Sequence, residues 1–261
     1  MPTSSSPLPA ATHQLPLRVR AKLLLWALVP AVAIVALAAY AVQSGREQHV
    51  RRAELLSQNL ASALDNTVGA EVAKLDIALV TIADLAQQQL AARGLDLPAL
   101  TKVVQAQRQR HPELSGIRVL DAQGTTLVGD NRPGEPPINL ADRDWFITQR
   151  GNTSGGLVMS QPLQRKIDGV WVVSFSRRIT DAQGRLAGVV SAAMPLQLLQ
   201  RHLQAVDVGP HGVVMLRDRS NRLLVRQTDE AGPAATPIGS RVMPPALAAL
   251  MDSGAPRGTV R

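Results

Sequence analysis

The sequence contains no cysteine and very few aromatic side chains. Without cysteine there is no disulfide framework and no thiolate metal site, and the compartment stays open because cysteine-free chains occur on both sides of a membrane. Aromatic residues make up only 2% of the chain and hydrophobic residues 45%, so the cores must be built mainly from alanine, valine and leucine. With 261 residues, the chain can form one large or two small domains.

Signatures of catalysis are also missing. The sequence has no G-x-S-x-G elbow, no Walker phosphate loop and no G-x-G-x-x-G turn. The five histidines are scattered without metal-ligand spacing, which favours surface or capping roles; they are His13, His49, His111, His202 and His211. We therefore expect no catalytic residue, no metal site and no cofactor.

Long basic runs are absent as well, although the formal net charge is +8. The basic residues are mostly arginines scattered among glutamine and aspartate, and few rings are present to stack on bases. Because a nucleic-acid interface needs clustered basic residues, we expect no nucleic-acid partner.

One long uncharged run is present near the start of the chain. Leu23 to Val42 is twenty residues without a charge, which as a helix matches a hydrocarbon core of about 30 Å. Trp26 and Tyr40 lie near its two ends, where amphipathic rings favour the membrane interface. A cleaved signal peptide is the alternative, but its apolar region is normally shorter. We predict a transmembrane helix over residues 23–43.

The flanks of this run indicate its orientation. Residues 1–22 contain no acidic residue and end in a basic cluster, so they are expected to form a cytoplasmic tail, although Arg46, Arg51 and Arg52 nearly balance the charge count. The chain would then be a single-pass protein of the inner membrane, with everything after the span in the periplasm or outside the cell.

A long helix is predicted over residues 46–93. This segment has no proline, and its apolar residues recur every three or four positions, which is the spacing of one helix face. The two interpretations are a helix packed on its own sheet and a stalk that pairs with a second copy of the chain. We expect the far half to pack on the sheet and the near half to form a homodimer. The apolar face is Leu56, Leu60, Leu64, Val68, Val72, Leu75, Leu79, Ile82 and Ala86.

The region from Gly116 to Met194 has the pattern of an antiparallel sheet. The tetrapeptide Asp-Ala-Gln-Gly occurs at Asp121–Gly124 and again at Asp181–Gly184, each time between two apolar runs, which predicts two tight hairpins in a sheet of about five strands. A second helix is predicted before the sheet, since Gly94 ends the long helix and Pro98 begins the next. Residues 186–194 are apolar on both faces and should form the central strand of the sheet.

The strand over residues 170–179 is expected to be two-faced. Trp171, Val173 and Phe175 point one way, while Ser174 and Ser176 point the other way. The serine face either lines a pocket or is simply exposed to solvent, and the alternation alone does not decide between the two.

The last part of the chain is expected to begin a second, smaller lobe. A short helix is predicted over residues 196–205, a third hairpin around Asp218–Asn221, and another short helix over residues 244–251. The strands and helix of residues 209–261 make too small a core to be stable alone. The lobe is therefore expected to be incomplete and the sequence truncated.

The best candidate for a binding element is Asp142-Arg143-Asp144-Trp145-Phe146. Asp142 is expected to cap a short helix that runs to about Gln149. Arg143 offers a planar set of donors that matches a carboxylate or phosphate, with the two rings as an apolar wall. The alternative is structural: Arg143 pairs with a neighbouring aspartate and the rings fill the core.

In combination, DRDWF, SQPL and GVWVVSFSRRITDAQGRLAGVVSAAM resemble the extracytoplasmic double Cache (PDC-type) sensor domains of bacterial signalling proteins, most of all those fused to diguanylate cyclases. The resemblance extends from about residue 46 to residue 261. It implies a ligand site in the distal lobe, at the R-x-[WY]-[YF] element. In this chain that element is Arg143, Trp145 and Phe146, with Lys166 and Ser176 nearby.

The sequence departs from that family in two respects. Its only tyrosine, Tyr40, lies in the predicted span, so the tyrosines that flank the element in amino-acid sensors are missing. The expectation is therefore a small carboxylate or no ligand at all. The GGDEF signature of the cyclase is absent as well.

Together these features predict an α+β protein: a transmembrane helix, a long helix, a PAS-like antiparallel lobe over residues 94–208 and an incomplete lobe over residues 209–261. The expected function is a membrane-anchored, non-catalytic ligand sensor, the input part of a diguanylate cyclase. The alternatives are the input domain of a histidine kinase or chemoreceptor, and a structural dimerisation and anchoring module with a vestigial pocket.

Overall fold

A computed structural model describes residues 17–129, 136–205, 212–228 and 236–243, with Pro245, Ala248 and Ala249. The chain divides into two compact units, residues 1–58 and 59–261. Helix α1 (Leu17–Ala92) begins in the first unit and ends in the second, and most of its side chains before Glu54 lie outside the described part. All contacts below lie within the second unit.

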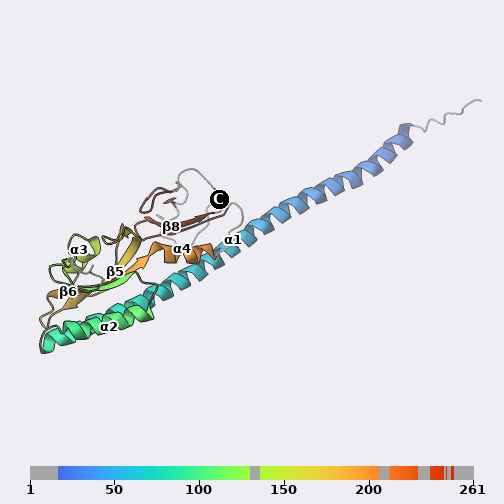
Figure 1. Cartoon of the computed structure of the whole chain (residues 1–261). Helices are drawn as coiled ribbons and strands as arrows, with labels where there is room; N and C mark the ends of the chain where they lie inside the picture. Colours follow the sequence, from blue (N-terminus) through green and yellow to red (C-terminus); the bar gives the residue numbers. More distant parts are fainter. Residues whose placement is uncertain are drawn as a thin grey trace, which may run out of the picture. The chain divides into compact units, whose positions relative to one another are not determined.

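The end of α1 and helix α2 (Leu97–Arg110) form a helical hairpin, with α2 alongside the last turns of α1 (Figure 1). Gly94 permits the turn because its φ is +95°, in the left-handed region that glycine tolerates. Asp96 then caps α2 by accepting a hydrogen bond from the backbone N–H of Ala99 at 3.0 Å, and Pro98 lies in the first turn. The predicted boundary between the two helices is confirmed.

The sheet is antiparallel with the strand order β2-β1-β6-β5-β3, and β4 pairs with the first residues of β5, as β3 does with later ones. The longest strands, β5 and β6, pair along their full length, and β6 is central, as predicted. The α+β class with an antiparallel sheet is thereby confirmed. The strands are β1 (Gly116–Asp121), β2 (Thr126–Val128), β3 (Val158–Met159), β4 (Leu163–Gln164), β5 (Trp171–Thr180) and β6 (Leu186–Pro195).

All three predicted hairpins form, and each turn begins with an aspartate. The Oδ1 atoms of Asp121, Asp181 and Asp218 each accept two backbone N–H bonds from the residues two and four positions later, at 2.8 to 3.0 Å. The turn then closes at a residue with positive φ: Gly124, Gly184 or Asn221. The aspartate thus replaces the backbone partners that the reversing chain lacks.

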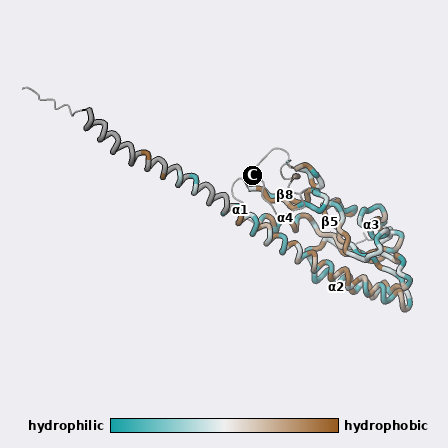
Figure 2. Tube along the Cα trace, turned by 180° about the vertical axis from the view of Figure 1, so that it is seen from behind, coloured by the Kyte–Doolittle hydropathy of each residue, from teal (hydrophilic) through white to brown (hydrophobic). Residues whose placement is uncertain are grey.

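Each face of the sheet is covered by helix. On one side Val173, Phe175 and Ile179 of β5 join a core with the far half of α1, where Leu75, Leu79, Ile82 and Ala86 are at most 1% exposed. The far half of the predicted apolar face of the long helix therefore packs on the sheet, as expected. Leu56, in the near half of that face, is 61% exposed. Figure 2 shows hydrophilic and hydrophobic residues alternating along α2, as one buried face requires. Helix α3 (Asp144–Gly151) packs on the other side of the sheet.

The core continues beyond the sheet. Helix α4 (Leu196–Gln204) follows β6 directly and packs on β8 (Leu223–Thr228), which pairs with β7 (Val213–Arg217). Leu198 and Leu203 of α4 share one core cluster with Leu224 and Val225 of β8. The helix expected over residues 244–251 lies almost entirely outside the described residues, and the lobe boundary at residue 208 stays a prediction.

In the part of the chain that is described, no helix combines the length and the hydropathy needed to cross a membrane. Most side chains of residues 23–43 lie outside that part, so the transmembrane helix stays a prediction.

The close approach of β6 to β1 depends on Gly188. A Cβ atom at this position would lie 2.3 Å from the carbonyl oxygen of Leu120, which is backbone and cannot move aside. We expect Gly188→Ala to lower the free energy of unfolding by about 2 kcal/mol or more, the usual cost of overpacking. Gly69→Ala is the matched control: nothing lies within 4 Å of that added Cβ. On helix α1 it should stabilise by about 0.5–1 kcal/mol. Urea unfolding measures both, and equal effects of the two substitutions would contradict the packing account.

An ion pair at the turn between β4 and β5 should make stability depend on pH. Arg165 Nε donates to Asp168 Oδ1 at 3.0 Å, Arg165 Nη1 donates to the Ser115 carbonyl, and the hydrogen bonding of Arg165 lowers the pKa of Asp168 to about 2. Because the folded pKa lies below the ordinary value of 3.8 for an aspartate, the pair stabilises the fold above about pH 4, and this contribution is lost as the pH falls toward 2.

We expect Asp168→Asn to lower the melting temperature at pH 7 and to change it progressively less between pH 4 and pH 2. Thermal unfolding by circular dichroism checks this. In an Arg165→Gln background the same substitution should have little effect at any pH, and a constant difference at all pH values would exclude the ion pair as the cause.

Candidate functional site

The Asp142–Phe146 element forms the start of α3, but its aspartates do not act as predicted. Arg143 is the N-cap residue and makes no side-chain capping bond. The Asp142 carboxylate accepts a hydrogen bond from Lys166 Nζ at 2.9 Å, and this contact lowers the pKa of Asp142. The predicted cap by Asp142 is therefore wrong: the helix begins two residues later, and Asp144 accepts the N–H groups of Trp145 and Gln161 at 2.8 Å each.

Arg143 and Lys166 lie at one edge of the sheet. The Nη2 atom of Arg143 donates to the Gln164 carbonyl oxygen of β4 at 3.2 Å, and Lys166 Nζ also donates to the Asn139 carbonyl oxygen at 3.2 Å. Arg143 is half-buried and Lys166 is exposed. Among the described residues Arg143 forms no ion pair with Asp142 or Asp144, although its charge contributes to lowering the pKa of Asp142.

The two rings belong to a small apolar cluster between α3 and the sheet. Trp145 is 3% and Phe146 0% exposed, with their ring centroids 6.1 Å apart in an edge-to-face arrangement. They pack with Leu120 of β1 and Val189 of β6. The two rings therefore attach α3 to the sheet, and toward a ligand they could provide only an apolar contact surface.

Ser176 lies at the other end of α3. It is fully buried, and its carbonyl oxygen accepts a hydrogen bond from Gln149 Nε2 at 2.7 Å. Arg143 bonds to Gln164, and Gln164 pairs with Trp171 at the start of β5. Ser176 lies five residues further along β5 than Trp171, a distance of about 16 Å at the usual rise of a strand. The structure thus brings Arg143, Lys166 and the rings to one end of α3, and leaves Ser176 apart from the two cations.

Ser176 is part of a larger buried set on this face of the sheet. Arg118 of β1 pairs in register with Ser191 of β6, and Ser191 pairs with Ser176 of β5. The three residues therefore form a row across the strands, on the face of the sheet that α3 covers. We call the set the polar strip; its members are Arg118, Gln149, Ser160, Ser174, Ser176 and Ser191, all at most 8% exposed.

The burial of the polar strip excludes one of the two interpretations of the serine face, exposure to solvent. Ser174 and Ser176 point away from the helical core, as predicted, but they are covered by α3 rather than exposed to solvent. Sequence reasoning missed the other four members. Arg118 alternates with the apolar Ile117 and Val119, which was a usable signal, whereas Ser191 is hidden in an apolar strand and Gln149 in a short helix.

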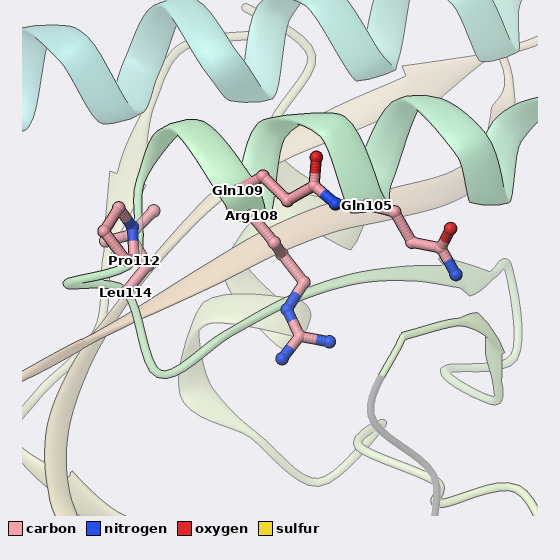
Figure 3. A pocket seen from close by; sticks show the side chains of 5 residues that line it. All are labelled: Gln105, Arg108, Gln109, Pro112 and Leu114. Atoms are coloured by element: carbon pink, nitrogen blue, oxygen red, sulfur yellow. The ribbon is translucent and has the colours of Figure 1, made fainter.

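Two surface hollows lie elsewhere. One, of about 430 Å³, is bounded by α1, β5 and the segment after α3, and includes Arg177 and Arg178. The other, of about 340 Å³, lies beside the end of α2; in Figure 3 Arg108 extends from the helix between Gln105 and the turn carrying Pro112 and Leu114. Neither contains a predicted site residue. Among the described residues, no group of three or more acidic or histidine side chains could hold a metal ion.

Comparison with known proteins places this architecture in a family. A Cache domain model, dCache_1, matches residues 35–252. No curated protein matches significantly. Among solved structures, the extracellular domain of a protein described as a histidine kinase, rpHK1S-Z16, is 29% identical, with a TM-score of 0.53 over 66% of this chain and 68% of that one.

Two chemoreceptor structures show the same fold at lower identity. The ligand-binding domain of Campylobacter jejuni Tlp3, solved with 4-methylisoleucine, is 15% identical with a TM-score of 0.54, covering 69% of this chain and 70% of that one. Methyl-accepting chemotaxis protein X is 16% identical with a TM-score of 0.59, covering 75% and 80%. Since the family model covers most of the sequence, the chain belongs to the Cache domain family, whose members are sensor modules of signalling receptors.

Proposed function

We propose that this chain is the extracytoplasmic input part of a membrane-anchored receptor, which binds a small anionic ligand between α3 and the sheet and performs no catalysis. The observation that carries the proposal is the polar strip beneath α3. Buried polar side chains cost stability unless they are hydrogen-bonded or bind something. Ser160, Ser176 and Gln149 Nε2 bond to the protein, whereas Gln149 Oε1 has no partner among the described residues. The other face of the same sheet is apolar, as a purely structural sheet requires.

Arg143 is the residue to which we assign capture of the ligand. Arg143 is half-buried, and the one hydrogen bond of its side chain among the described residues goes to a neutral carbonyl oxygen, at 3.2 Å. A carboxylate is a better acceptor than a carbonyl because its hydrogen bonds are charge-assisted and can be bidentate. Lys166 adds a second cation at the same edge, and Trp145 and Phe146 keep α3 in place.

A route from this site to α1 runs through two adjacent arginines of β5. Arg178 donates to the carbonyl oxygens of Gln149 and Asn152 at the end of α3, at 3.4 and 3.0 Å. Arg177 donates to both carboxylate oxygens of Asp76 on α1, at 2.5 and 2.8 Å. A shift of α3 on ligand binding would therefore change the contacts of α1. Signalling by this route requires two arrangements of these contacts that differ in ligand affinity.

The receptor type is the finer part of the proposal. We propose a diguanylate cyclase output on the sequence resemblance; the similar solved domains come instead from a histidine kinase and chemoreceptors, which supports those two outputs as alternatives. Tlp3 was solved with 4-methylisoleucine and with L-valine, so small metabolites are the class to screen.

The ligand proposal predicts the behaviour of an Arg143 variant. The full chain, in mild detergent, is screened for a rise in melting temperature with carboxylates, amino acids and amines. For any compound that raises it, Arg143→Ala should weaken binding about tenfold or more while the ligand-free melting temperature stays within a few degrees, because the lost bond is to a neutral carbonyl. Arg150→Ala, an exposed arginine of the same helix, is the control. Unchanged affinity in Arg143→Ala would remove this residue from the site, and a screen without any hit would favour the anchoring module.

We further propose that residues 23–43 anchor the chain and that the near half of the long helix forms a homodimer. The support is the uncharged run of residues 23–42 and the exposed leucines Leu55 and Leu56, each 61% exposed on α1. Burying exposed leucines in a helix pair is favourable by about 25 cal/mol per Å² of apolar surface.

The absence of cysteine makes this pairing directly testable. A single Leu56→Cys substitution should give an oxidant-dependent covalent dimer, found in the membrane fraction, because the two helices bring equivalent residues together. Lys102→Cys, on α2, is the control and should stay monomeric. A soluble chain would contradict the anchor, and a membrane-bound monomer in both variants would contradict the dimer.

A further inference from the structure

The hairpin of β7 and β8 has one packed face and one face that stays partly exposed. Val214 and Leu216 of β7 pack against the main core. Their neighbours Val213 and Met215 point to the opposite face, because side chains alternate along a strand, and they are 40% and 38% exposed. Arg226 of β8 pairs in register with Met215 and therefore lies on the same open face.

Residues 238–242 extend this open face. Two backbone hydrogen bonds, of 2.7 and 2.9 Å, tie the segment to Leu223 at the start of β8. Arg217 Nη2 donates to the Val242 carbonyl oxygen at 2.9 Å and contacts the sulfur of Met215 at 3.9 Å. Since Val242 is 75% exposed, the open face presents apolar side chains beside arginines.

The arginines of this face have no acidic partner among the described residues. After α4, the only acidic side chain in the described part of the chain is Asp218; its Oδ1 accepts the N–H groups of the turn and its Oδ2 pairs with Arg222 at 3.5 Å. Arg217 bonds to carbonyl oxygens and the Met215 sulfur, and Arg226 makes no hydrogen bond or ion pair with the described residues. The Nε atoms of Arg217 and Arg226 are both buried without a partner.

These features together call for an anion. Arg226 pairs with Met215, two residues before Arg217, so the two guanidinium groups are diagonal neighbours of like charge. Arg241, next to Val242, is exposed and adds a third cation. A phosphate group has several oxygens that can accept charge-assisted bonds from such donors. We call this surface the basic patch; its members are Arg217, Arg226, Arg241, Val213, Met215 and Val242.

We propose that the basic patch docks on the headgroups of anionic phospholipids. The arginines bind lipid phosphates, while the three apolar side chains enter the boundary between headgroups and acyl chains, the division of labour of interfacial protein segments. Free phosphate would leave the apolar side chains in water, and a second copy of this chain, with a formal net charge of +8, would bring charge of the same sign. The inference goes beyond ligand sensing and rests on the proposed anchor, which keeps the chain at a bilayer.

An anchored chain makes this contact intramolecular. Within the second unit, both views show α4 and β8 beside the earlier turns of α1 and α2 beside its last turns (Figures 1 and 2). The earlier turns are those that follow the predicted anchor along the chain. A tether raises the effective concentration of the patch at the bilayer, so a modest intrinsic affinity is sufficient.

The cysteine-free sequence allows a single reporter to test the inference. The full chain with Val242→Cys, labelled with an environment-sensitive fluorophore, is reconstituted into vesicles of phosphatidylcholine or of an equal mixture of phosphatidylcholine and phosphatidylglycerol. The emission should shift to shorter wavelength only in the anionic vesicles, and added salt should reverse the shift because it screens exposed charges. Ile147→Cys, at a residue of α3 that is 48% exposed, is the matched control and should show no shift.

Removing single charges then assigns the contact. Arg226→Gln and Arg241→Gln each remove a cation that makes no hydrogen bond with the described residues, so the fold should tolerate both. Each should lower the ratio of docked to free reporter about fivefold, the usual effect of one basic residue near an anionic bilayer. Arg150→Gln, on α3, should leave the ratio unchanged. An equal shift at Ile147→Cys, or a shift that survives in both patch variants, would overturn the inference.

Other occupants of the basic patch give different results. Emission that is already short in detergent and independent of lipid and salt would show that the chain itself covers the patch. A shift that disappears when the protein is diluted within the vesicles would show a second copy. Either result would overturn lipid docking.

Flotation separates this inference from the proposed anchor. A chain that floats with phosphatidylcholine vesicles but shows no lipid-dependent shift of the Val242→Cys reporter overturns the basic patch and leaves the anchor standing. A chain that does not float with these vesicles contradicts the anchor. In that case flotation with the anionic vesicles, lost in Arg226→Gln, still supports the basic patch, and no flotation with either kind of vesicle overturns both.

Discussion

The structure depends on one strand whose two faces do different work. The side chains of β5 alternate, so Val173, Phe175 and Ile179 enter the core with α1 and α2, while Ser174 and Ser176 face α3. The pleat of a strand enforces this division, since neighbouring side chains must point to opposite sides. A shift of the β5 register by one residue would put Ser174 and Ser176 in the helical core and Phe175 under α3. The packing on both faces of the sheet would then be lost together.

The same strand connects the two sides. Arg177 points to α1 and makes a two-point ion pair with Asp76, and that pairing raises the pKa of Arg177 above its ordinary value. Arg178, the next residue, points to the other side and holds the end of α3 through carbonyl oxygens. Two adjacent arginines on opposite faces of β5 therefore join the helix over the proposed site to the helix that runs toward the predicted anchor.

The few aromatic residues are used where they fix geometry. Of the two phenylalanines, Phe146 attaches α3 to the sheet and Phe175 faces the helical core, and Trp145 completes the α3 cluster. With the rings committed to packing, the buried polar side chains on the α3 face of the sheet are those of the polar strip.

Local patterns determined most of the fold. The repeated Asp-Ala-Gln-Gly turns, the apolar face of residues 72–86, the Gly94 and Pro98 boundary and the alternation of β5 each rest on neighbours within a few positions, so the sequence alone predicts hairpins, helices and strand faces. The cap expected of Asp142 failed because a residue 24 positions away, Lys166, pairs with that carboxylate.

The proposed site depends on contacts across the sheet. The sequence indicated Arg143, Trp145 and Phe146 through one contiguous element, but no local signal places Arg118 beside Ser191, 73 positions later, or Gln149 over Ser176. Such neighbours arise from strand pairing and from the packing of α3, whose energies depend on the whole assembled sheet. Turn chemistry and side-chain periodicity are properties of the sequence, whereas the polar strip exists only once the strands have paired.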